Sequence, residues 1–351
     1  MKKLILITII LQFLTFNLKA KNYSDCDSIS FGDFMFLYDL AESKGTTIPI
    51  ELSQPYNLRI LDNNHFLYSE WNESPMLRII SIDSLDCMGY INFGFGQFDM
   101  NSIREVQLMT DSTLTVFDGV TGKLFELKWI PPMELQLISA NQFNKNAVFN
   151  LTKKGKNEFI WTGNNNTDFL CHYRDTKGKV KSFSILPDIP HEENVEVMDY
   201  DIQTRLIWNE DKKRLITAAI SWDIITIYDE NLNLIKRFRG PVFIDSMLRD
   251  NKGVTHVPYP SFHGLSGGIQ MSESGFSVAY GGMNTNEDDK NNYLKYILNF
   301  DWNGNPLSII KSDVPAIGYS YDIDTNHLLI ITEENGKPTL RQFFLSLAQK
   351  D

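Results

Sequence analysis

A hairpin pattern that recurs along the chain constrains the fold more than any other feature. In each copy a short strand-like run ends in an acidic residue, a polar or glycine-bearing turn follows, and a second strand-like run returns. The acidic residues of the copies are Asp83, Asp118, Asp175, Asp229, Asp301 and Glu334. An array of such hairpins is typical of a β-propeller or a related all-β repeat fold, in which stacked sheets bury faces that a single sheet would leave bare.

The spacing of these acids indicates how many sheets the ring contains. They are separated by 35, 57, 54, 72 and 33 residues, so they need not mark the same hairpin in every blade. Residues 21–351 give roughly 55 residues per blade for six blades and roughly 47 for seven, and a four-stranded blade needs about 40 to 50. We therefore predict one all-β domain over residues 21–351, a propeller of six four-stranded antiparallel blades, with seven blades as the alternative.

Strand signals dominate the chain from Phe31 to its end. Phe125, Leu127 and Trp129 alternate with charged residues, as expected of a half-buried strand. Helical periodicity is weak and confined to residues 34–42 and 340–350, and both segments fit strands equally well.

The first twenty residues have the layout of a secretory signal peptide. A basic start precedes the apolar run Leu4–Phe16, and Leu18–Ala20 offers a cleavage site. The apolar run is shorter than the about 20 residues that a spanning helix needs. A lipoprotein would need a small residue before the modified cysteine, but Asp25 precedes Cys26. We predict an exported protein of the periplasm or cell exterior, with an uncleaved membrane anchor as the alternative.

The charge of the chain excludes some classes of partner. Residues 1–20 contain three lysines and no acid, so their removal changes Lys plus Arg from 33 to 30 against 44 acids, and the net charge from −11 to −14. Such a chain is repelled by nucleic acid and by anionic membranes. We expect no nucleic-acid binding, no transmembrane segment after signal cleavage, and a monomer.

The cysteines are few and odd in number. Cys26, Cys87 and Cys171 include no C-x-x-C pair, and at least one of them cannot pair within the chain. We expect Cys87 and Cys171 to be small buried apolar residues beside strands.

Several segments resemble a known family of propellers. Tyr293–Leu307 has a tyrosine-led strand running into Phe-Asp-Trp-x-Gly-x-Pro, and Tyr321–Asp324 and Leu328–Thr332 follow it. Gly94–Asp99 stands where the family often has a longer Gly-Pro-Gly-Glu-Phe motif, but it lacks the proline. The chain thus resembles the TolB-like six-bladed propellers that Bacteroidetes export. The resemblance implies the fold and export, and it transfers no catalytic residues because the family has no agreed activity.

Two motifs that suggest chemistry have simpler interpretations. Gly264–Gly268 matches G-x-S-x-G, the nucleophile elbow, which requires a strand–turn–helix. Ile269–Tyr280 instead predicts strand, turn and strand, so we interpret the motif as a glycine-rich turn. Asp229–Asn233 mimics a calcium loop, but Leu234 occupies the glycine position and Gly240 the glutamate position, which indicates a hairpin turn.

One loop contains candidate ligand-binding residues. The cluster of aromatic and imidazole groups in a proline-rich stretch comprises His256, Tyr259, Phe262 and His263. Rings on a long loop suit stacking against a sugar or a peptide, and the alternative is a loop packed on itself. The six histidines show no local metal spacing. We predict no cofactor, although one residue per blade could assemble a calcium or zinc site in the channel without any trace in the spacing.

These observations leave two functional hypotheses. The first is a binding or scaffold propeller of the cell envelope, with a protein or glycan partner and no catalysis. The alternative is an enzyme with a central-channel site, such as a glycan lyase, a glycosidase or a metal-dependent lactonase. Only the fold supports the second hypothesis, and a fold does not determine function.

Overall fold

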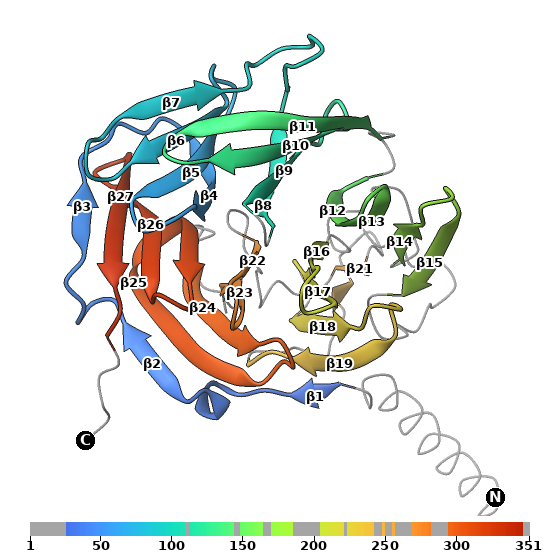
Figure 1. Ribbon diagram of the computed structural model, residues 1–351. Coiled ribbons are helices and arrows are strands. Elements are labelled where there is room, and N and C mark those ends of the chain that lie inside the picture. Colours follow the sequence, from blue (N-terminus) through green and yellow to red (C-terminus); the bar gives the residue numbers. More distant parts are fainter. Residues whose placement is uncertain are drawn as a thin grey trace, which may run out of the picture.

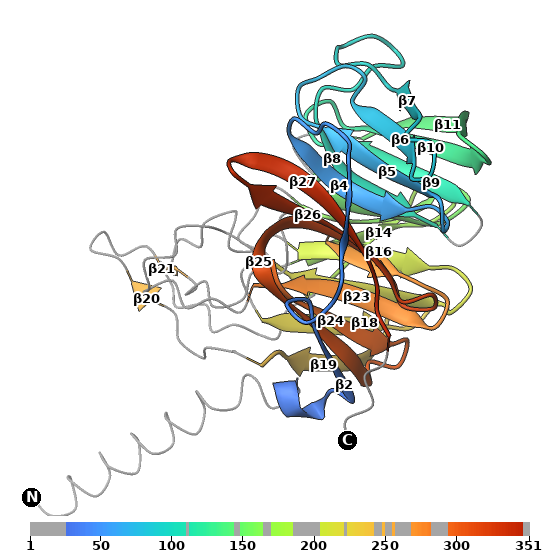
Figure 2. The same cartoon turned by 90° about the vertical axis from the view of Figure 1, so that its left-hand side faces the viewer.

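The fold is a ring of six antiparallel sheets. The computed structural model describes residues 26–109, 112–143, 148–163, 170–184, 204–220, 223–241, 248–249, 255–256, 268–281 and 294–346. Figure 1 looks down the ring, and Figure 2 shows it from the side with the β20–β21 hairpin (Leu248–Arg249 and Thr255–His256) off one face. The predicted six-bladed, all-β propeller with four-stranded blades is confirmed. The predicted signal peptide, residues 1–20, lies outside the described residues.

Blades 1 to 3 each consist of four consecutive strands from the axis to the rim. Blade 1 comprises β4 (Pro55–Ile60), β5 (His65–Glu70), β6 (Leu77–Ser81) and β7 (Cys87–Tyr90). Blade 2 comprises β8 (Ile103–Leu108), β9 (Thr113–Asp118), β10 (Lys123–Ile130) and β11 (Glu134–Gln142). Blade 3 comprises β12 (Asn150–Gly155), β13 (Glu158–Thr162), β14 (Leu170–Arg174) and β15 (Val180–Ser184).

Blades 4 to 6 follow the same order. Blade 4 comprises β16 (Thr204–Asn209), β17 (Arg214–Ala219), β18 (Ile224–Tyr228) and β19 (Leu234–Arg239). Blade 5 comprises β22 (Ile269–Met271), β23 (Gly275–Tyr280), β24 (Leu294–Asp301) and the first part of β25 (Pro306–Asp322). The second part of β25 then begins blade 6, which continues with β26 (His327–Glu334) and β27 (Lys337–Phe344).

The N-terminal segment forms a belt around the outside of these three blades. A 3₁₀ turn, η2 (Phe31–Asp33), separates its first two strands. β1 (Asp27–Ser28) pairs in parallel with β19, β2 (Phe36–Asp39) pairs in parallel with β25, and β3 (Thr46–Ile48) pairs antiparallel with β27. Figure 1 shows β1, β2 and β3 along the rim. β3 is the fourth strand of blade 6, so the two ends of the chain close the ring in one sheet.

The repeated acids occupy two kinds of turn. The turn between the third and fourth strands of a blade contains or directly follows Asp83, Asp175, Asp229 and Asp301, whereas Asp118 and Glu334 end second strands. This difference explains the irregular spacing of the repeats.

The core lies between the blades. Among the described residues, the buried apolar side chains form six clusters, and each cluster joins two neighbouring sheets. All residues of β9, β16 and β23 are buried, because these strands have a sheet against both faces. In such a strand the side chains on both faces are buried, so buried and exposed residues no longer alternate along it.

One expectation about the cysteines was wrong. Cys171 is buried on β14, as predicted, but Cys87 is exposed on β7, the outermost strand of blade 1. The rim strand has no sheet beyond it, so its side chains reach solvent. All three cysteines are free thiols.

No helix in the described part of the chain is long and apolar enough to cross a membrane. Ile269–Tyr280 forms β22, a turn and β23, as predicted, so no helix follows the G-x-S-x-G motif.

Ring closure by β3 predicts the effect of shortening Ile48. This side chain is 4% exposed and its Cα pairs with that of Leu340. Ile48→Ala should lower the free energy of unfolding by about 2–5 kcal/mol, because it leaves a cavity in the closing sheet. Urea unfolding measures this effect. Thr47→Ala, at an exposed position of the same strand, should cost less than about 1 kcal/mol, and equal losses for both variants would contradict the role of Ile48.

A buried histidine in blade 6 is held in its neutral form. His327 is 0% exposed and stacks on Phe344 at 4.7 Å between ring centroids. Its Nε2 lies 2.9 Å from Nε2 of Gln342, so the amide donates and the imidazole nitrogen accepts. Burial lowers the pKa of His327, and the negative charge of Asp322 opposes this shift.

The lowered pKa of His327 predicts that stability falls in mild acid. Below the unfolded pKa of about 6.5 the unfolded chain binds a proton that the folded chain excludes, so the free energy of unfolding decreases as the pH falls. Urea unfolding at about pH 7.5 and 5.5 should show this decrease, and His327→Gln should make it smaller. Burial also lowers the pKa of His172, which both the wild type and His327→Gln contain. The difference between these two proteins in the loss of stability from about pH 7.5 to 5.5 therefore reports on His327 alone. An unchanged difference between the two pH values in His327→Gln would contradict the assignment.

Candidate functional site

The axis of the ring is lined by polar side chains that form hydrogen bonds with the backbone of other blades. Among the described strands, the inner strand of each blade has no ladder partner on its axial side, and unpaired backbone groups must find other partners when buried. Nε2 of Gln107 donates to the carbonyl of Leu206 at 2.8 Å, and the N–H of Trp208 donates to Oγ1 of Thr152 at 3.2 Å. Buried polar side chains on the inner strands thus serve as partners for backbone groups at the axis.

Near the middle of the axis a carboxylate lies between two guanidinium groups. Oε1 of Glu105 lies 3.2 Å from Nη2 of Arg59, and its Oε2 lies 2.6 Å from Nη1 of Arg205 and 2.9 Å from Nδ2 of Asn150. Arg59, Glu105 and Arg205 are 3%, 4% and 8% exposed. Burial lowers the pKa of Arg59, and the charge of Glu105 opposes that shift. These three residues form an axial network that joins blades 1, 2 and 4.

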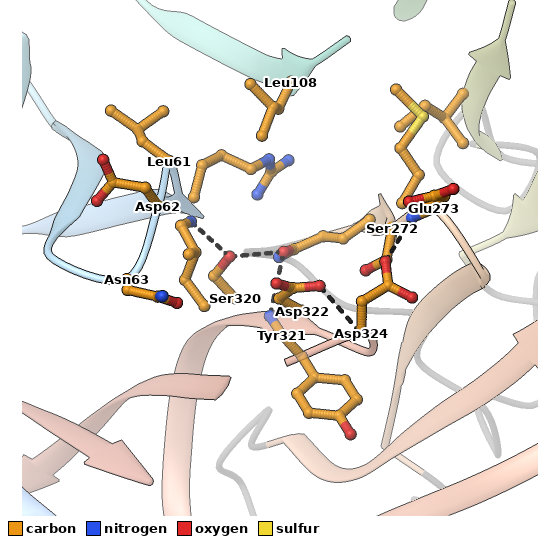
Figure 3. A pocket seen from close by; sticks show the side chains of 15 residues that line it. Leu61, Asp62, Asn63, Leu108, Ser272, Glu273, Ser320, Tyr321, Asp322 and Asp324 are labelled. Atoms are coloured by element: carbon orange, nitrogen blue, oxygen red, sulfur yellow. Dashed lines mark hydrogen bonds between the residues drawn. The ribbon is translucent and has the colours of Figure 1, made fainter. Parts of the chain in front are cut away.

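A pocket of about 210 Å³ lies at one end of the axis. Arg59 is one of its lining residues, together with turns that follow inner strands. Figure 3 shows Asp62 and Asn63 on one side and Glu273 on the other. The pocket has apolar walls contributed by Ile60, Leu61, Leu108, Ile207 and Met271.

Three of the four carboxylates at the pocket hold turns in place. Asp62 accepts hydrogen bonds from the N–H groups of Asn64 and His65, both at 2.7 Å, and lies 2.9 Å from Nδ1 of His65. Asp324 accepts from the N–H groups of Glu273 and Ser274 at 2.7 and 3.2 Å, which ties blade 5 to blade 6.

The third of these carboxylates, Asp322, is the last residue of β25, directly before the turn that leads to β26. Its side chain accepts from the N–H of Asp324 at 3.1 Å and from the hydroxyl of Thr325 at 2.6 Å. The fourth carboxylate, Glu273, has no side-chain hydrogen bond within the described residues, and neither has Asn63. The rim of the pocket thus combines three engaged acids with two polar side chains that can bind a ligand.

His256 is the one residue of the predicted ligand-binding cluster that the structure describes, and it is not among the described residues that line this pocket. His256 lies in β21, within the connection that leads into β22, whereas the pocket is built by turns that follow inner strands. Tyr259, Phe262 and His263 lie outside the described residues, so their role stays a prediction. Within the described residues, no three His, Cys, Asp or Glu side chains are grouped so that they could hold a metal ion.

A second exposed feature is an aromatic loop between blades 1 and 2, residues 93–98. Phe93, Phe95 and Phe98 are 42%, 77% and 58% exposed. The loop is held by a hydrogen bond from the N–H of Gly96 to Oδ2 of Asp99 at 3.0 Å. A fixed loop that exposes three aromatic rings is typical of an interaction surface. The glycines in the sequence indicate a loop here, but they do not indicate that its aromatic rings are exposed.

The residues of the pocket were not predicted from the sequence. Asp62 and Asn63 form an ordinary polar turn, and nothing in the order of residues relates them to Glu273. The pair Arg59–Glu105 is 46 residues apart and the pair Arg205–Glu105 is 100 residues apart. The only available signal was that each blade begins with a strand rich in polar residues.

Comparison with known proteins supports the fold and does not identify a family. No family model matches the sequence, and no curated protein matches it. A protein of unknown function from Bacteroides thetaiotaomicron is similar in structure, with a TM-score of 0.50 and 9% identity over 87% of this chain and 74% of that chain.

Two characterised proteins are also similar in structure. Virginiamycin B lyase from Staphylococcus aureus has a TM-score of 0.47 and 9% identity over 87% of this chain and 99% of its own. Regucalcin, a calcium-binding protein from Agrobacterium tumefaciens, has a TM-score of 0.47 and 9% identity over 90% and 98%. The arrangement of its own strands makes this chain a six-bladed β-propeller, with a polar axis and a small axial pocket.

The axial network predicts a large effect of neutralising Glu105. Glu105→Gln removes the charge that the buried guanidinium of Arg59 pairs with, and one ion-pair partner of Arg205, so the free energy of unfolding should fall by about 3–5 kcal/mol in urea. Glu134→Gln, at an exposed position of β11, should change it by less than about 0.5 kcal/mol. A loss below about 1 kcal/mol for Glu105→Gln would show that the network is not needed for stability.

Proposed function

We propose that this protein is an exported TolB-like propeller of the cell envelope that acts as a binding or scaffold module without catalysis. Its partner is a glycan or an envelope protein, and its binding site is the axial pocket. The resemblance of Tyr293–Leu307 to the family and the signal-like layout of residues 1–20 support export to the periplasm or cell exterior.

One observation carries the non-catalytic part of the proposal. The carboxylates of Asp62, Asp322 and Asp324 each accept two or more hydrogen bonds from their own or a neighbouring turn. A general acid or base must exchange protons with a substrate, whereas an acid that fixes a turn contributes shape and charge. Glu273 is then the one unengaged carboxylate among the described residues that line the pocket, whereas glycoside hydrolysis uses a pair of carboxylates. The pocket therefore suits recognition of a ligand that is released without chemical change.

Exposed aromatic rings provide a second surface for a partner. Phe93, Phe95 and Phe98 lie on the connection that precedes β8, away from the turns of the pocket. Two separate surfaces on one rigid ring suit a module that connects partners.

Native purification tests this proposal. The protein, incubated with cell-wall fragments and envelope extracts, should retain a ligand whose mass is unchanged on elution, and its own mass should match a chain that begins at Lys21. Products of altered mass, formed in excess over the protein, would instead support the lyase, glycosidase or lactonase alternative. A lower melting temperature in EDTA, restored by calcium or zinc, would also contradict the proposal, because it would indicate a metal in the channel. A mass that includes residues 1–20 would show that the apolar run remains as an anchor.

A further inference from the structure

We propose that the axial pocket binds one neutral sugar unit of a glycan, with Arg59 at its base and Asn63 and Glu273 at its rim. This inference rests on the proposed binding function and names the ligand of the same site. Three features of the pocket support it, namely its spare hydrogen-bonding groups, its charge and its size.

The base of the pocket offers hydrogen-bond donors. Arg59 is 3% exposed and lines the pocket. Its Nη1 donates to the carbonyl of Leu58 at 2.7 Å and its Nη2 donates to Glu105 at 3.2 Å. A guanidinium has five N–H donors, so the remaining ones have no partner among the described residues. N–H groups of a pocket-lining guanidinium that are not used by the protein favour a ligand with an oxygen acceptor, such as a hydroxyl group.

The rim offers both donors and acceptors. Asn63 and Glu273 lie on opposite sides of the pocket, and neither side chain has a hydrogen-bond partner within the described residues (Figure 3). The hydroxyl of Ser272 accepts from the N–H of Ile323 at 3.0 Å, so its own proton remains available. Sugar hydroxyl groups donate and accept at once, and they match a mixture of amide, carboxylate, hydroxyl and guanidinium groups.

The charge of the pocket excludes anionic ligands. Four carboxylates line it, those of Asp62, Glu273, Asp322 and Asp324, against the single guanidinium of Arg59. The positive charge of Arg59 is balanced by Glu105 behind it. An acid on the ligand would therefore meet like charges at the rim. A cationic group would be repelled by the guanidinium of Arg59 if it entered the base of the pocket, so a neutral ligand suits both the base and the rim.

The size and walls of the pocket limit the ligand to one ring. About 210 Å³ is less than the roughly 300–1,000 Å³ of sites that enclose drug-sized molecules. The aliphatic side chains of Leu61, Leu108, Ile207 and Met271 form its apolar lining. They suit the C–H faces of a pyranose ring, whose hydroxyl groups then point to the polar residues.

Calorimetric titration with methyl hexopyranosides tests the proposal. The purified protein should bind at least one of the neutral methyl glycosides of glucose, galactose or mannose with a Kd on the order of 1 mM. Glucuronate should bind at least about tenfold more weakly, because its carboxylate faces the acids of the rim.

Rim variants identify the site. Glu273→Ala and Asn63→Ala should each weaken binding of that glycoside about tenfold, because each removes a hydrogen bond to the ligand. Neither side chain has a structural hydrogen bond, so both variants should unfold at the same urea concentration as the wild type. Glu134→Ala, an exposed glutamate on β11, is the matched control and should leave the Kd unchanged.

Three results would overturn the sugar assignment. No binding of any neutral glycoside would exclude this ligand, and a Kd that neither rim variant alters would exclude this pocket as its site. Stronger binding of lysine methyl ester would indicate a basic peptide instead. If the protein still retains an unchanged ligand from envelope extracts, the binding function stands and only the sugar assignment fails. If a bound glycoside is instead converted to a product of different mass, the sugar site stands and the non-catalytic function fails.

Discussion

Closure of the ring is the constraint on which the rest of this structure depends. Each sheet has two apolar faces, and only a closed ring gives every face a neighbour. The chain achieves closure by placing β3 beside β27, so that residues from both ends of the sequence form one sheet. The same N-terminal segment adds β1 and β2 to blades 4 and 5, which covers the open edges of those sheets.

Closure also creates the polar axis. Six inner strands meet around a centre in which they have no ladder partners, so their free backbone groups need side-chain partners. Gln107 and Thr152 supply such partners by bonding to the inner strand of blade 4. The buried pair of Arg59 and Glu105 belongs to this layer of polar residues. The polar residues of the axis are thus required by the fold itself, whether or not a ligand binds there.

The pocket forms where this polar layer ends and the turns begin. Asp324 bonds to the backbone of Glu273 and Ser274, so the turns of two blades are fixed relative to each other. This arrangement holds Glu273 at the rim without using its carboxylate. A ligand therefore meets a preformed site, and little ordering of side chains opposes binding.

The fold could be predicted from the sequence to a large extent, and the site could not. The repeated hairpins and the strand alternation at Phe125, Leu127 and Trp129 are local patterns, because a strand's period and its turn residues are set by neighbours in the chain. They predicted the all-β class and the strand that follows Gly268, and the length of the chain favoured six blades over seven. The sequence did not predict that Cys87 is exposed, because the position of its strand at the rim depends on how the sheets assemble into the ring. The meeting of Arg59, Glu105 and Glu273 was also missed, because it depends on the closure of sheets far apart in sequence, and no local pattern records which inner strands share an axis.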